Sequence, residues 1–184
     1  MPDGQKNPFW SDFARFVIIS ILVIVPIRAW VAQPFIVRGA SMEPTFHDSE
    51  YLIIDELSYE WRKPERGEVI VFRFPEDTAK FFIKRVIGLP GETIEIRDNK
   101  VFLIMDGKEK ELKESYLSEP LTAPGGLTRL GEKEYLVLGD NRLFSSDSRR
   151  WGALQENLII GRAWLRLWPP GRINFLPGLN RFQI

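Results

Sequence analysis

The pattern of apolar and polar positions divides the chain into two unlike parts. From Phe16 to Ile27 no position carries a charge and only Ser20 is polar, while arginines at 15 and 28 flank the run. A bilayer core of about 30 Å needs roughly 20 helical residues, so residues 29–32 would have to extend the apolar length and the arginines would have to reach outward. A buried core helix or the apolar region of a cleaved signal peptide is an alternative, but no small-x-small cleavage site follows in the right place. We therefore predict a retained membrane anchor over residues 13–34, preceded by a short segment, residues 1–12.

Beyond residue 35 the pattern changes to short runs rich in β-branched and aromatic residues. Such runs predict strands, and they lie at residues 51–54, 69–72, 81–87, 93–96, 101–104 and 135–138. Residues 97–100 between two of these runs predict a hairpin turn, because Asp98 and Asn99 tolerate the left-handed conformation that such turns need. We expect residues 35–184 to form one mainly β domain.

Two segments lack the strand pattern. Residues 106–133 are first rich in charged residues and then in proline and glycine, which is typical of a variable surface excursion rather than of core. Residues 168–184, which include Pro169-Pro170-Gly171, predict an irregular closing segment.

Composition excludes several classes of function. Lysine plus arginine and aspartate plus glutamate each number 25, so net charge gives no support for a nucleic-acid partner. The chain has no cysteine, which excludes a disulfide framework and a thiol nucleophile. His47 is the only histidine, so a multi-histidine zinc site cannot form. We expect no cofactor and no metal.

Ser41 is the candidate nucleophile. It lies in Gly39-Ala40-Ser41-Met42-Glu43-Pro44-Thr45, where glycine, alanine and proline favour a tight turn that can hold a hydroxyl and an amide towards a substrate carbonyl. Taken alone, such a serine is more often a turn residue or a helix cap. His47, six residues later, has the setting of a surface histidine and is not expected to act as its base.

Lys84 is the candidate base. Strand alternation places Phe82, Lys84 and Val86 on one face, so the lysine is flanked by apolar side chains. Burial lowers the pKa of a lysine by up to about 3 to 5 units, which supplies a neutral amine near neutral pH. An isolated lysine at such a position more often reaches from a strand edge into solvent. Arg85, on the opposite face, is expected to be structural.

The loop from Gly139 to Gly152 concentrates hydroxyls, carboxylates and guanidinium groups directly after an apolar strand. A serine from this loop can aim the lysine amine, and Asp147 can pair with Arg149 to stiffen the loop. A solvated turn rich in aspartate and asparagine is the alternative.

Together these segments resemble the type I signal peptidases, a family of membrane-bound serine proteases. The resemblance rests on the apolar segment and on four motifs in order: residues 39–45, 67–72, 83–92, and 139–142 continuing to 151–152. It implies a mainly β fold class, with a single N-terminal transmembrane helix followed by a β-barrel-like signal-peptidase catalytic domain. It leaves out only the first dozen residues, residues 106–133 and the tail.

The resemblance also implies roles for individual residues. Ser41 attacks the scissile carbonyl and Lys84 is the general base and then the general acid. Ser145 matches the serine that orients the lysine, and Asp147 and Arg149 match a structural ion pair. The Ser41 main-chain amide matches one oxyanion donor.

Two positions depart from the family pattern. Position 39, a serine with a donor hydroxyl in some members, is Gly39 here, so a side-chain oxyanion donor is in doubt. Leu143 and Phe144 replace a polar Asp-Asn pair that is often found after Gly-Asp-Asn-Arg, so this part of the loop is expected to pack apolarly.

The implied substrates are the signal peptides of secreted or translocated preproteins, cut after small residues in an Ala-x-Ala pattern. The implied topology is a short cytoplasmic N-terminus, a single-pass anchor and an extracytoplasmic catalytic domain. The bacterial plasma membrane is the expected location, with the thylakoid or mitochondrial inner membrane as alternatives. Membrane lipid and the protein translocation machinery are the expected partners.

Two other functions fit parts of the sequence. A membrane-anchored, β-rich protein could bind peptides or scaffold a complex without catalysis, and Ser41→Ala would then leave its function intact. A self-cleaving repressor also uses serine and lysine, but it needs a DNA-binding module where this chain has residues 16–27.

Overall fold

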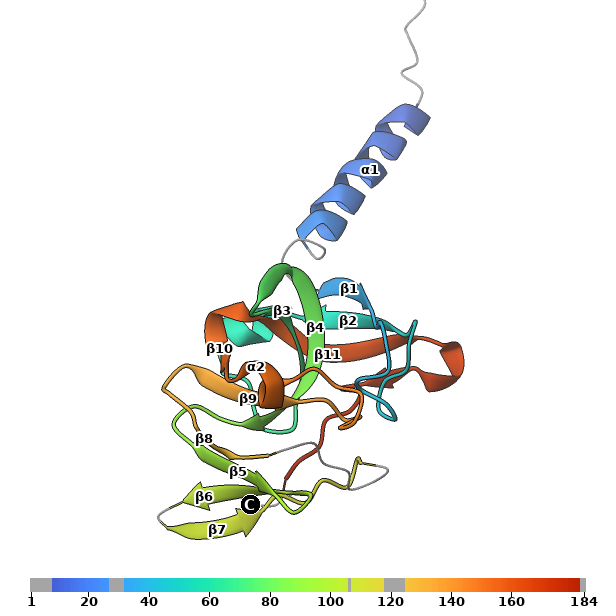
Figure 1. Cartoon of the computed structure of the whole chain (residues 1–184). Helices are drawn as coiled ribbons and strands as arrows, with labels where there is room; N and C mark the ends of the chain where they lie inside the picture. Colours follow the sequence, from blue (N-terminus) through green and yellow to red (C-terminus); the bar gives the residue numbers. More distant parts are fainter. Residues whose placement is uncertain (1–7, 27–31, 106, 118–124, 183–184) are drawn as a thin grey trace, which may run out of the picture.

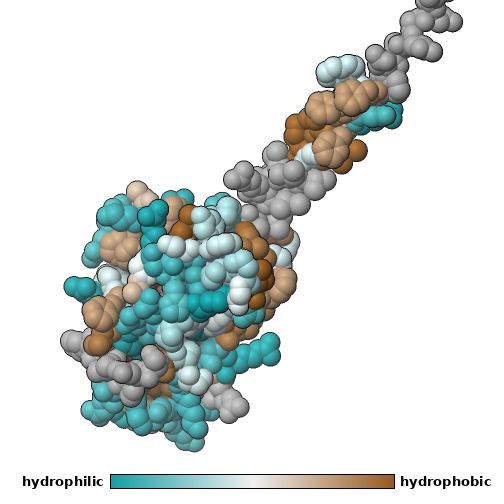
Figure 2. All heavy atoms as spheres, turned by 90° about the vertical axis from the view of Figure 1, so that its right-hand side faces the viewer, coloured by the Kyte–Doolittle hydropathy of each residue, from teal (hydrophilic) through white to brown (hydrophobic). Residues whose placement is uncertain are grey.

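The computed structural model describes residues 8–26, 32–105, 107–117 and 125–182. A long helix, α1, runs from Pro8 to Pro26 and stands apart from a mainly β domain (Figure 1). Figure 2 shows α1 as largely hydrophobic, whereas the face of the β domain turned to the viewer is largely hydrophilic. No helix among the described residues has both the length and the apolar character that a membrane span requires.

The predicted anchor covers residues 13–34, but α1 begins five residues earlier and ends at Pro26. Residues 27–31 lie outside the described residues, as do residues 1–7 of the predicted N-terminal segment. The first strand, β1, already begins at Ala32 and pairs with the strand that follows the Ser41 loop. The end of the predicted anchor therefore overlaps the β domain.

The larger sheet has the order β1-β2-β11-β3-β4-β9-β10, with β12 paired to β11. Its strands are β1 (Ala32–Ile36), β2 (Tyr51–Asp55), β3 (Val69–Phe74), β4 (Asp77–Gly88), β9 (Glu134–Leu138), β10 (Leu154–Gln155), β11 (Ile159–Trp168) and β12 (Asn174–Phe175). The smaller sheet, at the end of the domain away from α1 in Figure 1, has the order β7-β6-β5-β8. Its strands are β5 (Thr93–Arg97), β6 (Lys100–Met105), β7 (Lys108–Glu111) and β8 (Leu127–Arg129).

The helices of the β domain are short. They are α2 (Ser148–Trp151) and the 3-10 turns η2 (Leu57–Glu60), η3 (Glu156–Leu158) and η4 (Pro170–Arg172). Apolar side chains pack in three clusters, one beneath the small sheet and two within the large one. Neither sheet closes on itself among the described strands, so the closed form expected from the resemblance is not seen.

All six predicted strands are present, and the mainly β fold class is confirmed. The predicted hairpin turn is also confirmed, with Asp98 at φ 46° and Asn99 at φ 66°. The prediction for residues 106–133 is wrong in part. Leu112 and Leu130 are buried in the core cluster beneath the small sheet, because β7 and β8 pair with its strands. Residues 106 and 118–124 lie outside the described part.

Strand register places the candidate loops next to paired strands of the large sheet. Ile36 of β1 pairs with Tyr51 of β2, so the loop that carries Ser41 leaves one end of this hairpin. Arg85 of β4 pairs with Leu138 of β9, so the strand that carries Lys84 lies beside the start of the loop 139–147.

Candidate active site

The Ser41 loop is held at its base and by its apolar residues. The Val37 amide donates to the Glu50 carbonyl at 2.9 Å and closes the loop. Met42 and Phe46 are fully buried on either side of the turn that follows Ser41. Because Met42 and Phe46 lie within five residues of Ser41, they hold its hydroxyl in a partly exposed position rather than on a free loop.

Ser41 and Lys84 meet in the structure. Lys84 Nζ lies 2.8 Å from Ser41 Oγ and donates a second hydrogen bond, also of 2.8 Å, to the carbonyl of Ile83. The lysine is only 3% exposed and stands 5.3 Å from the centre of the Phe82 ring. The apolar surroundings expected from strand alternation are therefore present.

Burial lowers the pKa of Lys84 from 10.5 to about 8, although the nearby carboxylates of Asp147 and Asp140 act in the opposite sense. A substantial fraction of the amine is then neutral in mildly alkaline water. A neutral amine within hydrogen-bond reach of a hydroxyl can remove its proton, which is the arrangement that an activated serine nucleophile requires.

A cavity of about 500 Å³ opens beside the two residues. Its walls come from strands β1 to β4, the Ser41 loop and the loop 139–147. Apolar side chains dominate them: Phe35, Ile36, Val37, Leu52, Val71, Phe81, Phe82 and Ile83. Its size and lining suit a short apolar stretch of extended peptide.

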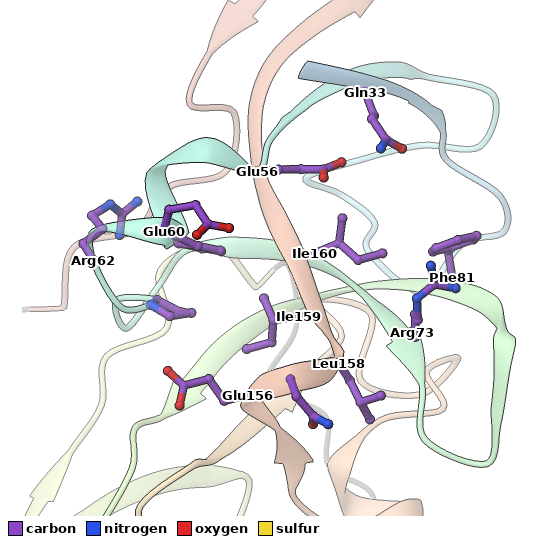
Figure 3. Close-up of a pocket in the computed structure, with 13 residues that line it drawn as sticks. Gln33, Glu56, Glu60, Arg62, Arg73, Phe81, Glu156, Leu158, Ile159 and Ile160 are labelled. Carbon is purple, nitrogen blue, oxygen red and sulfur yellow. The ribbon is translucent and has the colours of Figure 1, made fainter. Parts of the chain in front are cut away.

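A second cavity of about 430 Å³ lies between η2, η3 and the middle of the large sheet (Figure 3). Its lining is more polar and contains neither Ser41 nor Lys84, although Phe81 borders both cavities. Figure 3 shows Glu60 and Arg62 at one side and Arg73 with Phe81 at the other. Arg62 is already engaged with the buried Glu68, so its charge is not free for a ligand.

The loop 139–147 is stiffened by the expected pair. Arg149 donates to both carboxylate oxygens of Asp147 at 2.8 Å, and the Gly139 amide donates to the same carboxylate at 3.0 Å. Burial acts to raise the pKa of Asp147, but these hydrogen bonds outweigh it and hold the pKa below its ordinary value. Asp147 therefore remains charged and fixes the loop.

Ser145 does not make the expected bond to Lys84. Its Oγ is buried, lies beside Asp147 and has no hydrogen bond of ordinary geometry within the described residues. The Ile83 carbonyl takes the second hydrogen bond of Lys84 instead. Ser145 packs closely against Gly139, where an added Cβ would lie 2.2 Å from its Oγ.

Two buried ion pairs near the site were not assigned from the sequence. Arg85, expected only to be structural, is fully buried and donates to Asp140 at 2.8 and 2.6 Å. Thr45 donates to the same carboxylate, so this pair also holds the Ser41 loop. Glu114 binds the buried Arg142 through both of its oxygens. No local pattern signals such pairs, because 55 and 28 residues separate their members.

The turn before Ser41 decides which groups could donate hydrogen bonds to an oxyanion. Gly39 has φ 81°, a backbone angle that residues with a side chain rarely adopt. Its amide donates to the Asp48 carboxylate at 2.7 Å. A serine hydroxyl at position 39 would thus be strained in this backbone. The Ser41 amide makes no hydrogen bond within the described part of the chain.

His47 lies away from the chemistry. Its Nδ1 is 3.4 Å from Glu43, and both side chains are more than one third exposed. This agrees with the interpretation of His47 as a surface histidine.

Comparisons with known proteins show the family to which this chain belongs. The family described as "Signal peptidase, peptidase S26" matches residues 10–168. "Probable signal peptidase I-2" from Synechocystis sp. (strain ATCC 27184 / PCC 6803 / Kazusa) is 36% identical over 173 residues, which cover 91% of this chain and 77% of that protein. "Signal peptidase I" from Leptolyngbya laminosa is 37% identical over 166 residues, covering 86% and 79%. A crystal structure of a signal peptidase I from Enterococcus faecalis V583 aligns at 32% identity with a TM-score of 0.48, covering 55% of this chain and 97% of that one.

Proposed function

Because this chain belongs to the signal peptidase family, peptidase S26, and is a protease with signal peptidase I activity, we propose that Ser41 and Lys84 are its catalytic dyad. The observation that carries the proposal is the 2.8 Å approach of the buried Lys84 amine to the Ser41 hydroxyl. The lowered pKa of Lys84 supports the same assignment, since a protonated lysine could not act as a base.

In the proposed mechanism, neutral Lys84 takes the Ser41 proton while Oγ attacks the scissile carbonyl. The resulting ammonium returns the proton to the leaving amine, which gives an acyl-enzyme and a free new N-terminus. Lys84 then takes a proton from the water that attacks the acyl group, and the resulting ammonium returns a proton to Ser41 Oγ as the ester bond breaks. The Ser41 amide is the proposed oxyanion donor, and position 39 supplies no side-chain donor because it is a glycine.

Ser145, Asp147 and Arg149 are proposed to position the dyad rather than to react. The Asp147–Arg149 pair fixes the loop whose Ser146 lines the same cavity as Lys84. Ser145 is buried beside that pair, and its hydroxyl makes no hydrogen bond of ordinary geometry within the described residues. A hydrogen bond to the Lys84 amine, formed during turnover, is the proposed means by which Ser145 orients that amine.

Signal peptides of preproteins are the substrates, and we infer cleavage after small residues in an Ala-x-Ala pattern. An extended peptide can lie along the cavity between β1 and β4, with alternate side chains pointing into its apolar wall. A proposed single-pass anchor around α1, an extracytoplasmic β domain and a bacterial plasma-membrane location would keep this cavity near the lipid surface. Membrane lipid and the translocation machinery are the proposed further partners.

The test is cleavage of a preprotein with an Ala-x-Ala junction by the full chain in detergent, between about pH 6 and pH 10. Wild type should cleave with a rate that rises towards a plateau above about pH 8, whereas Ser41→Ala and Lys84→Ala should be inactive but folded. Lys108→Ala, which removes an exposed lysine from β7, is the matched control and should behave like wild type. If Ser41→Ala cleaves as well as wild type, the dyad assignment fails. If wild type does not cleave the preprotein and Ser41→Ala still binds it, a scaffold function replaces the proposed catalysis.

A further inference from the structure

The loop between β9 and α2 carries two exposed apolar side chains at its tip. Leu143 is 55% exposed and Phe144 is 74% exposed. Neither belongs to a hydrophobic cluster formed by the described residues, so the apolar packing expected for this part of the loop is not found. Single exposed apolar residues are ordinary, but two large neighbours in a loop that borders the active site form a surface suited to binding.

The loop holds this tip in place. The Asn141 amide donates to the Ser41 carbonyl at 3.0 Å, so the start of this loop is hydrogen-bonded to the nucleophilic residue. The Phe144 amide donates to the Asn141 carbonyl at 3.2 Å and closes a turn. Arg149 donates to the Arg142 carbonyl at 2.8 Å. Because the backbone is bound on both sides, the loop cannot turn over to carry these two side chains into the core without breaking these bonds.

The position of the tip points to one occupant. Ser146 lines the dyad cavity together with Ser41, but Leu143 and Phe144 do not. Consecutive Cα atoms are about 3.8 Å apart, so the Cα atom of Phe144 lies within roughly 8 Å of that of Ser146 in the cavity wall. Under the proposed function, the walls on β1 and β4 receive the residues before the cleaved bond. An extended chain advances about 3.3 Å per residue, so the first three or four residues after that bond can reach the tip.

We infer that Leu143 and Phe144 bind apolar side chains among the first residues that follow the cleaved bond. The two residues thus give the enzyme a preference for the mature end of its substrate, separate from the small residues before the bond. This inference rests on the proposed function, because it assumes that the peptide crosses Ser41.

The experiment compares two preproteins with the same Ala-x-Ala junction. One continues with Ala-Leu-Phe-Leu after the cleaved bond and the other with Ala-Asn-Ser-Asn. Both are cleaved by full-length wild type, by the double variant Leu143→Asp/Phe144→Asn and by Leu127→Asn, all in detergent. Leu127 is the matched control because it is also 55% exposed but lies on β8 of the small sheet. Thermal unfolding midpoints verify that all three proteins are folded.

Wild type and Leu127→Asn should prefer the apolar substrate by roughly five- to tenfold in kcat/KM, mainly through KM, as expected for partial burial of two apolar side chains. The double variant should lose this preference. An equal preference in wild type and double variant would overturn the inference, as would no preference in wild type, while cleavage of both substrates would still uphold the proposed function. A double variant that is impaired only on lipid vesicles, with its preference in detergent intact, would also overturn it and assign the tip to the membrane.

Discussion

Replacing Lys84 with methionine should stabilise the protein at neutral pH, and the gain should fall as the pH rises. The lysine is 3% exposed, and burial lowers its pKa from 10.5 to about 8 against the opposing effect of Asp147 and Asp140. Well below pH 8 both the folded and the unfolded chain carry the proton, so the full cost of the buried charge is present. At 1.36 kcal/mol per pKa unit, this cost is about 3 kcal/mol.

Between pH 8 and pH 10.5 the folded chain has released the proton and the unfolded chain still holds it. The unfolded state then binds more protons, so the stability of wild type rises with pH in this window. The methionine variant lacks this contribution. The difference in unfolding free energy between the two proteins should therefore shrink by roughly 2 to 3 kcal/mol between pH 7 and pH 10.

The assay is urea unfolding of the full chain in mild detergent, followed by tryptophan fluorescence at several pH values. Groups other than Lys84 titrate in both proteins and largely cancel in the difference. Lys108→Met provides the control, because this lysine on β7 is exposed and its replacement should change stability little at any pH. A gain for Lys84→Met that stays constant from pH 7 to pH 10 would show that Lys84 has an ordinary pKa and would refute the reasoning.

Three further predictions concern the same site. The kcat/KM of wild type should rise about tenfold per pH unit below pH 8 and then level off, as Lys84 loses its proton; a flat profile would exclude it as the base. Asp140→Ala should lower the unfolding free energy by about 3 to 5 kcal/mol in urea denaturation, because it leaves Arg85 buried without its partner; a loss below about 1 kcal/mol would contradict this. Gly139→Ala should lower kcat at least about tenfold and cost roughly 1 to 3 kcal/mol, because the new Cβ would lie 2.2 Å from Ser145 Oγ; full activity would argue against the packing described.

The strands that the sequence predicts are those whose runs of β-branched and aromatic residues are apolar throughout, as in β3 and β9, or at alternate positions, as in β5 and β6. The longest strand not predicted, β11, lies in the centre of the large sheet. Its pattern is obscured because Arg166 is buried against Glu50 and Arg162 pairs with Asp55. Charged residues that are neutralised by distant partners interrupt the apolar alternation on which strand prediction depends. Such strands become recognisable only when the partners are known.

The candidate site shows the same limit. The meeting of Ser41 and Lys84 follows from chemical type together with a family resemblance, since a nucleophile needs a base and an apolar strand can depress the pKa of a lysine. Glu114 could not be assigned this way. It lies in the segment expected to be a surface excursion, yet its side chain is only 6% exposed and is bound to Arg142. Whether a carboxylate from a charged segment is buried depends on a long-range contact that local sequence does not encode.

The buried ion pairs around the dyad affect the pKa of Lys84 as well as the stability of the fold. Replacing such pairs with apolar residues is often neutral or stabilising, because burying two charges is costly. Here the carboxylates of Asp147 and Asp140 both act to raise the pKa of Lys84, which opposes its use as a base. Each carboxylate is held by an arginine, Arg149 or Arg85, whose positive charge offsets part of that effect. Because of these arginines, Asp147 and Asp140 can hold the catalytic loops in place close to Lys84, although Lys84 must lose its proton at moderate pH.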